Sequence, residues 1–215
     1  MTVSGIYLVT SEPAPGVGLL EVIDAAVDAG VETVQLRAKD ASARDFLDLA
    51  TSAAGVIRRR ARLLVNDRVD VLLAARAWGV PVDGVHLGQS DLPPAVARTL
   101  LGPDSVLGLT ADTRAHLAAL PEAGVVDYIG VGAVHPTSTK PDHPAPLGVT
   151  GFAEFATQAP VPCVAIGGIT VADVAELRGA GASAIAVASA ICAADDPGRA
   201  AADLLAAWTS AEETR

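Results

Sequence analysis

Short apolar runs recur along the chain and alternate with longer segments rich in Ala and Leu. The short runs contain many Val, Ile and Leu residues, and their length and composition are typical of buried β-strands. We predict eight such strands, at Ile6–Val9, Glu32–Leu36, Leu63–Val65, Gly84–Leu87, Ser105–Leu109, Tyr128–Val131, Val161–Ile166 and Ala184–Ala188.

The segments between these runs place apolar residues at helical spacing. They predict eight helices, at Leu19–Ala29, Ala43–Arg59, Arg68–Trp78, Pro94–Leu101, Arg114–Leu120, Gly151–Gln158, Val171–Arg178 and Arg199–Trp208. Strict alternation of strands and helices indicates a parallel sheet with right-handed crossovers, and eight such units close into a barrel. We therefore predict an α/β protein with a single (β/α)8 TIM barrel domain over residues 1–215, and the alternative is a doubly wound open sheet.

Composition supports one folded domain and excludes some partners. Hydrophobic residues make up 51% of the 215 residues and charged residues 19%, so the chain can bury a large core. A formal net charge of -10 argues against a nucleic-acid-binding surface. We interpret the basic run Arg58-Arg59-Arg60, with Arg62, as side chains that contact the carboxyl end of a helix.

Cysteine usage and hydropathy predict a cytoplasmic protein without a membrane partner. Cys163 and Cys192 lie far apart in apolar surroundings and have no C-x-x-C spacing, which favours free thiols. The N-terminus lacks the pattern of a signal peptide, and every apolar stretch is interrupted before about 18 residues.

Polar residues gather after the predicted strands, which is where a barrel of this type carries its active site. Most of them can bind anions, and a glycine pair before a helix can present backbone N–H groups to a phosphate. They are Gln35, Arg37, Lys39, Asn66, Asp67, Gln89, Asp91, Thr110, Thr137, Thr139, Lys140, Gly167, Gly168 and Ser189.

Alternation places the side chains of Gln35, Arg37 and Lys39 on one face of the chain if the second strand extends that far. Arg37 could then hold two phosphate oxygens while Lys39 supplies a compact charge, which suits a diphosphate. The alternative is a strand end stabilised by ion pairs.

Asp67 and Asp91 follow neighbouring predicted strands, so their carboxylates could meet. Two carboxylates, waters and substrate phosphate oxygens are ligands that suit Mg²⁺. Taken singly, Asp67 could instead cap the next helix, and Asp91 could be a turn residue before Pro93.

The segment Gly132–Thr150 is too long for a routine connection and is expected to be functional. The histidines lack metalloprotease spacing, and no nucleotide-binding or acyl-transfer motif is present. We expect His116 on a surface helix, and we place His135 and His143 in the long loop without assigning them a role.

Five segments in order resemble the thiamine-phosphate synthase family along nearly the whole chain. They are Val34-Gln35-Leu36-Arg37-Ala38-Lys39, Val65-Asn66-Asp67-Arg68, Gly84-Val85-His86-Leu87-Gly88-Gln89-Ser90-Asp91, Thr137-Ser138-Thr139-Lys140 and Ala165-Ile166-Gly167-Gly168-Ile169. Each segment is modest evidence alone, but the five together at the expected strand ends are specific.

The resemblance implies a reaction between two phosphorylated small molecules. Hydroxymethylpyrimidine diphosphate would lose pyrophosphate to give a stabilised carbocation, and the nitrogen of a thiazole phosphate would attack it. The pyrimidine diphosphate would be held by Gln35, Arg37, Lys39, Asn66, Thr110 and Lys140, of which Arg37, Lys39, Thr110 and Lys140 are the expected catalytic residues. The thiazole phosphate would be held by Thr137, Thr139, Gly168, Ala188 and Ser189. Asp67 and Asp91 would bind Mg²⁺.

The sequence departs from the family pattern at Thr110, Asp112 and Ala188, where the family often has Ser, His and a larger apolar residue. Thr110 keeps a hydroxyl group and Ala188 can act through its backbone, whereas Asp112 brings a carboxylate near an anion site. The rival functions are a thiazole tautomerase on the same barrel, a phosphosugar isomerase, and a non-catalytic thiazole-phosphate binder. The residues that the resemblance assigns to the diphosphate and to Mg²⁺ are all present in this sequence, and a tautomerase would not need them. Their joint presence favours the synthase over its rivals.

Overall fold

The protein forms a closed parallel barrel in the computed structural model, which describes residues 3–137 and 145–213. Each strand pairs with the next in sequence, and β8 pairs with β1. The strands are β1 (Gly5–Val9), β2 (Thr33–Leu36), β3 (Arg62–Asn66), β4 (Gly84–Leu87), β5 (Val106–Thr110), β6 (Tyr128–Val131), β7 (Cys163–Ile166) and β8 (Ala184–Val187). The predicted (β/α)8 barrel is therefore confirmed.

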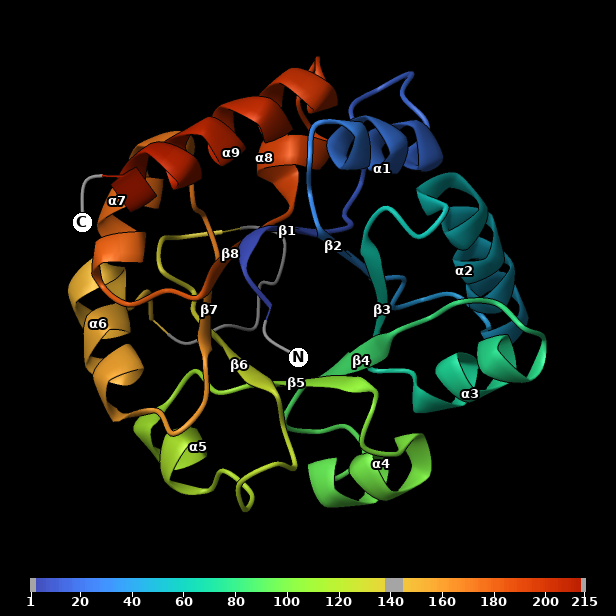
Figure 1. The fold of residues 1–215 in the computed structure, drawn as a ribbon, viewed down its shortest axis with the longest axis horizontal. Helices are drawn as coiled ribbons and strands as arrows, with labels where there is room; N and C mark the ends of the chain where they lie inside the picture. The colour runs from blue at the N-terminus through green and yellow to red at the C-terminus, as the bar shows by residue number, and fades with distance from the viewer. Residues whose placement is uncertain (1–2, 138–144, 214–215) are drawn as a thin grey trace.

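Helices surround the strands, as Figure 1 shows in a view along the barrel. The longer ones are α1 (Leu19–Asp28), α2 (Ala43–Ile57), α3 (Val69–Ala77), α4 (Pro94–Leu101), α6 (Gly148–Gln158) and α9 (Pro197–Glu213). The shorter ones are α5 (Arg114–Ala118), the 3-10 turn η1 (Val171–Asp173), α7 (Val174–Gly179) and α8 (Ser189–Cys192).

The predicted boundaries differ from the observed ones in a few places. The second strand ends at Leu36 and does not extend to Lys39. The short helix α8 directly follows β8 and was not predicted, because four residues are too few to show a helical period. Helix α9 is longer than expected at both ends.

Alternation along the strands divides the buried side chains into two cores. Ile6 and Leu8 of β1 pack outward against the helices, whereas Tyr7 and Val9 point into the barrel. The inner core is small and consists of Val3, Tyr7, Val9, Leu64, Val106, Tyr128, Val164, Ala184 and Ala186. Burial of the larger outer core between strands and helices contributes most of the hydrophobic stabilisation.

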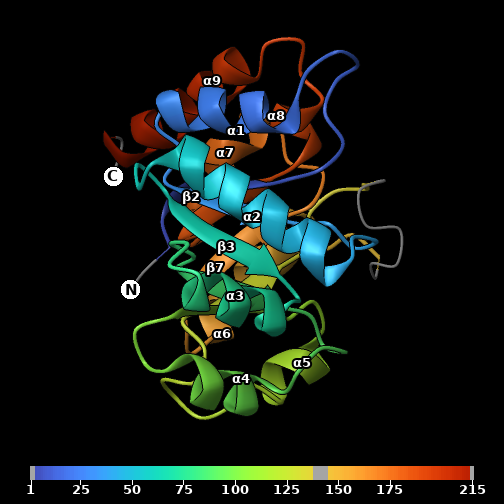
Figure 2. The same ribbon diagram turned by 90° about the vertical axis from the view of Figure 1, so that its right-hand side faces the viewer.

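All eight strands run in the same direction, so their carboxyl ends open on one face of the barrel. Figure 2 shows the barrel from the side, with the arrow of β3 pointing toward that face. The loops after the strands meet there and form the site described below. Within residues 3–137 and 145–213, no helix is long and apolar enough to cross a membrane.

Candidate active site

A cavity of about 660 Å³ opens at the carboxyl ends of the strands. Its lining comes from all eight βα units, and it includes most of the residues that the sequence singled out. The predicted residues that line it are Gln35, Arg37, Lys39, Asn66, Asp67, Gln89, Asp91, Thr110, Thr137, Gly167, Gly168, Ala188 and Ser189. The structure thus brings them together, and the role of each one stays a prediction.

Three predicted positions lie outside the described residues. Thr139 and Lys140, which were expected at the thiazole phosphate and the diphosphate, belong to the segment 138–144, as does His143. Thr137 is the last residue described before that segment, and its side chain contributes to the cavity.

The carboxyl groups of Asp67 and Asp91 interact directly in the cavity. Partial burial, the contact with Asp91 and the negative charge of Asp91 raise the pKa of Asp67 to about 6, although the positive charges of Lys39 and Arg37 act against this rise. Burial and a like charge at short range both raise the pKa of a carboxyl group. Two carboxylates and two cations therefore converge at the ends of β2, β3 and β4.

The backbone around Asp67 excludes the helix-cap alternative. Arg68, not Asp67, is the N-cap residue of α3, and its side chain makes no capping hydrogen bond. Asp67 has a left-handed backbone conformation with φ of 65°, which is costly for a non-glycine residue and is typical of functional sites. Its N–H donates to the carbonyl of His86 at 2.8 Å, so the strained residue is fixed to β4.

Asp91 is a turn residue whose carboxyl group also lines the cavity, and its role as a metal ligand stays a prediction. Its Oδ2 atom accepts a hydrogen bond from the Gly88 N–H at 2.6 Å, which closes a turn before Pro93. The same carboxyl group meets Asp67 in the cavity. The turn therefore fixes Asp91 opposite Asp67.

The carboxylate pair fits a hard divalent cation. Adjacent carboxylates repel each other, and a cation between them would remove that repulsion. No group of three or more His, Cys, Asp or Glu side chains that could hold a metal occurs among the described residues. Two protein carboxylates completed by water and phosphate oxygens match the way Mg²⁺ is usually held.

A chain of buried hydrogen bonds crosses the barrel beneath the cavity. The Gln35 Nε2–H donates to the Tyr7 hydroxyl at 2.6 Å, and the Tyr7 and Tyr128 hydroxyl oxygens lie 2.9 Å apart. His86 Nδ1 lies 3.0 Å from the Tyr128 hydroxyl, and His86 Nε2 lies 3.1 Å from Oγ1 of Thr110. Two predicted ligand residues, Gln35 and Thr110, are thus held at the ends of one network.

Burial keeps both tyrosines of this network uncharged. Desolvation raises the pKa of Tyr7 and that of Tyr128 well above the usual range for a phenol. Gly108 leaves the space that the network needs, because a Cβ atom there would collide with the ring of Tyr128 and with Nδ1 of His86. Sequence reasoning missed Tyr7, His86 and Tyr128, although a tyrosine at an inward-facing strand position requires a partner for its hydroxyl.

The glycine pair of the β7–α7 connection packs tightly against the β6–α6 loop. Gly168 has φ of 66°, and a Cβ atom there would come within 2.8 Å of His135 and 2.7 Å of the carbonyl oxygen of Pro136. His135 N–H donates to the Gly167 carbonyl at 2.9 Å, and its Nε2 atom lies 3.0 Å from Oδ1 of Asp173. His135 therefore joins the two loops and is not one of the residues that line the cavity.

His116 lies on a surface helix, as expected, because no residue of α5 is buried. It lies in α5, but its side chain lines the cavity and its Nδ1 atom is 2.7 Å from Oδ1 of Asp112. Its contact with the cavity was not expected, and it arises because α5 starts at the cavity rim, with Thr113 as its N-cap. A side chain in the first turn therefore faces inward.

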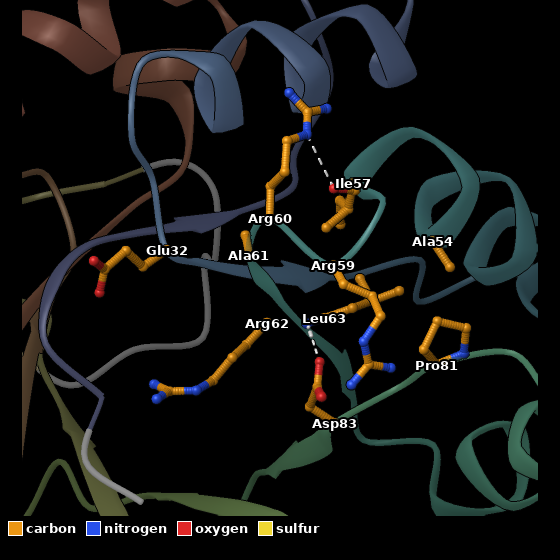
Figure 3. A pocket seen from close by; sticks show the side chains of 10 residues that line it. All are labelled: Glu32, Ala54, Ile57, Arg59, Arg60, Ala61, Arg62, Leu63, Pro81 and Asp83. Carbon is orange, nitrogen blue, oxygen red and sulfur yellow. Dashed lines mark hydrogen bonds between the residues drawn. The ribbon is translucent and has the colours of Figure 1, made fainter.

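A second cavity, of about 330 Å³, lies on the opposite face of the barrel (Figure 3). Its lining includes Arg59, Arg60 and Arg62 together with the carboxylates of Glu32 and Asp83. Arg60 donates to the carbonyl of Ile57 at the end of α2, as the sequence predicted, and it also pairs with two aspartates of α1. Arg60 thus links α1 to α2, and the cavity carries charges of both signs, so its lining does not favour anions.

Both predicted thiols are free and buried. Cys163 and Cys192 form no disulfide. Burial raises the pKa of each thiol, that of Cys163 to about 11. Neither is activated as a nucleophile.

Comparison with known proteins gives one consistent result. The family described as "Thiamine monophosphate synthase" matches residues 6–191. A thiamine-phosphate synthase of Xanthobacter autotrophicus is 44% identical over 208 residues, 96% of each chain, and one of Azorhizobium caulinodans is 42% identical over 89% of this chain and 88% of its own. The solved thiamine phosphate pyrophosphorylase of Pyrococcus furiosus superposes with a TM-score of 0.82 at 29% identity, with 96% of both chains covered. The chain therefore belongs to the thiamine monophosphate synthase family and is a transferase.

Proposed function

We propose that the protein couples hydroxymethylpyrimidine diphosphate to a thiazole phosphate in a magnesium-dependent reaction that yields thiamine phosphate and pyrophosphate. The observation that carries this proposal is the contact between Asp67 and Asp91 beside Arg37 and Lys39 in one cavity. A carboxylate pair next to two cations suits a metal-bound diphosphate. It would be an unfavourable arrangement in a pocket for an uncharged ligand.

Two halves of the cavity fit the two substrates. The side of β2, β3 and β4 carries the charged groups and would hold the diphosphate. The side of β7 and β8 carries Gly167, Gly168, Ala188 and Ser189, at the loop positions where barrels of this class often bind a phosphate. Between them, Gln35 and Thr110 sit at the two ends of the buried network and would hold the pyrimidine ring.

The protein would act mainly through electrostatics and positioning. As the bond from the pyrimidine methylene carbon to the diphosphate oxygen breaks, the oxygen keeps the electron pair and negative charge grows on pyrophosphate. Arg37 and Lys39 would stabilise that charge, and Lys140 would add to them. The thiazole nitrogen then forms the new bond to the carbon with its lone pair, and no covalent bond to the protein is needed.

Asp67 and Asp91 would hold Mg²⁺, which would neutralise part of the charge on the diphosphate. The pair fits this role because the negative charge of Asp91 opposes ionisation of Asp67, and a cation between them would remove that effect. We also propose a cytoplasmic location, in keeping with two free cysteine thiols.

The test is an assay of purified protein with both substrates, with magnesium or with excess chelator. Formation of thiamine phosphate only with magnesium supports the synthase. Binding of thiazole phosphate without product would instead favour a tautomerase or a non-catalytic binder. Asp91→Asn separates the metal role further, since it should weaken the magnesium dependence and lower turnover, whereas an unchanged magnesium titration would remove Asp91 from the metal site.

A further inference from the structure

Asp112 and His116 form a pair in the wall of the cavity to which neither sequence nor family comparison gives a role. Asp112 is 9% exposed and follows β5 by two residues, on the same side of the chain as Thr110. Its Oδ1 atom lies 2.7 Å from Nδ1 of His116, and both residues line the cavity. The pair is therefore placed where a ligand can reach it.

Two contacts fix the orientation of His116. Its backbone N–H donates to the side chain of Thr113, the N-cap of α5, at 3.1 Å. Because a carboxylate only accepts hydrogen bonds, the contact with Asp112 requires Nδ1 to carry a proton. Nε2 makes no hydrogen bond with any residue in the described part of the chain, so it is the atom left to interact with a ligand.

The charges around the cavity indicate which ligand this atom would meet. The described side chains that line it include three carboxylates, those of Asp67, Asp91 and Asp112, but only two permanent cations, Arg37 and Lys39. Asp112 would repel a diphosphate if it were unpaired. Protonated His116 would donate Nδ1–H to Asp112 and Nε2–H to an anion on its other side.

Asp112 and His116 follow β5, which places them near the side of the cavity where the diphosphate is proposed to bind. Strand β5 pairs with β4, whose following loop carries Gln89 and Asp91. Gln89 Nε2–H in turn donates to the carbonyl of Thr110 at the end of β5, so the two loops are in contact. The glycine pair that suits the thiazole phosphate follows β7, two strands further along the barrel.

We propose that His116, oriented by Asp112, contacts the diphosphate of the substrate and the pyrophosphate product through Nε2–H. This proposal rests on the proposed function. It makes His116 a substrate-contacting residue and Asp112 a positioning residue, whose carboxylate fixes the orientation of the ring.

Two amide variants separate a ligand contact from a merely structural role. In His116→Asn the side-chain amide can replace Nδ1 and keep the bond to Asp112, but nothing replaces Nε2. In His116→Gln the amide reaches the position of Nε2 and can donate to the ligand. Arg114→Gln is the matched control on the same helix, because it removes only an ion pair with Glu154 in which both side chains are largely exposed.

The measurement is the affinity of each variant for inorganic pyrophosphate with magnesium, by titration calorimetry, with thermal unfolding as the check on folding. We expect His116→Asn to bind about tenfold more weakly, His116→Gln to recover most of that loss, and Arg114→Gln to match the wild type. Affinity for thiazole phosphate should not change in any of them. Wild-type pyrophosphate affinity in His116→Asn, or an equal loss for both ligands, would overturn the proposal.

The same titration distinguishes this inference from the proposed function. If the wild type binds pyrophosphate but forms no thiamine phosphate with both substrates and magnesium, the proposed function fails while the contact with His116 is still decided by the variants. If the wild type is active and His116→Asn keeps its pyrophosphate affinity, only the inference about His116 fails.

Discussion

The hydroxyl groups of Tyr7 and Tyr128 meet at 2.9 Å in the interior of the barrel, although 121 positions separate them in the sequence. Through this contact β1 and β6 share one hydrogen-bond network, with Gln35 at one end and Thr110 at the other. A buried polar group that loses its hydrogen-bond partner destabilises the protein, so each member of the network is held in place by its neighbours. The network therefore fixes Gln35 and Thr110 at the cavity, and the two tyrosines stay uncharged.

Tyr7→Phe should weaken pyrimidine binding without unfolding the barrel. The variant removes the hydroxyl that accepts from Gln35 and leaves that amide without its partner. We expect a loss of about 1 kcal/mol in the free energy of unfolding and a KM for the pyrimidine diphosphate that is raised about two- to tenfold. Steady-state kinetics with each substrate varied in turn would measure this, and a KM raised only for thiazole phosphate would contradict it.

Gly108→Ala should disrupt the same network by collision. The added methyl group would overlap the ring of Tyr128 and Nδ1 of His86, so one of the two rings must move. Overpacking of this kind typically costs about 1–3 kcal/mol. Gly55→Ala is the matched control, since a Cβ atom there meets nothing within 4 Å and alanine is about 1 kcal/mol better than glycine inside a helix.

Chemical denaturation of the two alanine variants gives the comparison. Gly108→Ala should be less stable than the wild type and less active, whereas Gly55→Ala should be at least as stable and fully active. Equal stability of Gly108→Ala and the wild type would show that the barrel interior has room that the structure does not indicate.

Asp67→Asn should stabilise the metal-free protein at neutral pH while it impairs magnesium binding. The pKa of Asp67 in the folded protein is about 6, above the ordinary value of 3.8, so its ionised form opposes folding. This penalty is present above about pH 6 and disappears as the pH falls toward 4. We expect a gain on the order of 1 kcal/mol at pH 8 for this half-exposed group, and asparagine tolerates the left-handed backbone.

Asp70→Asn provides a control of opposite sign. The pKa of Asp70 is lowered by its hydrogen bond with Arg68, so its charge favours folding and its removal should lower the melting temperature slightly. Thermal unfolding of both variants between pH 4 and 8, with and without magnesium, tests the pair. A destabilised Asp67→Asn at pH 8 without metal would refute the penalty that burial and Asp91 impose on ionised Asp67.

Much of the fold could be predicted because it depends on local patterns. The eight strands were predicted from short apolar runs, and the polar residues of the cavity were predicted from the positions that follow those runs. All eight runs contain an observed strand or overlap with one. The convergence of Asp67 with Asp91 was also predictable, because carboxyl ends of neighbouring parallel strands meet on one face.

The remaining features depend on tertiary contacts that no local pattern contains. The pairing of Tyr7 with Tyr128 requires the register of the closed barrel. The inward direction of His116 depends on where α5 begins relative to the cavity rim, and a difference of one residue in the start of a helix turns a side chain by about 100°. The left-handed conformation of Asp67 has no sequence signal, since the residue is not a glycine.

The carboxylate pair of Asp67 and Asp91 and the neighbouring cations are proposed to serve magnesium-dependent coupling. The most direct measurement is thiamine phosphate formation from hydroxymethylpyrimidine diphosphate and thiazole phosphate by the wild type and Asp91→Asn across a magnesium titration. We expect product from the wild type that disappears with chelator, and low turnover with a shifted magnesium requirement in the variant. Product formation by the wild type that is unaffected by chelator would contradict it.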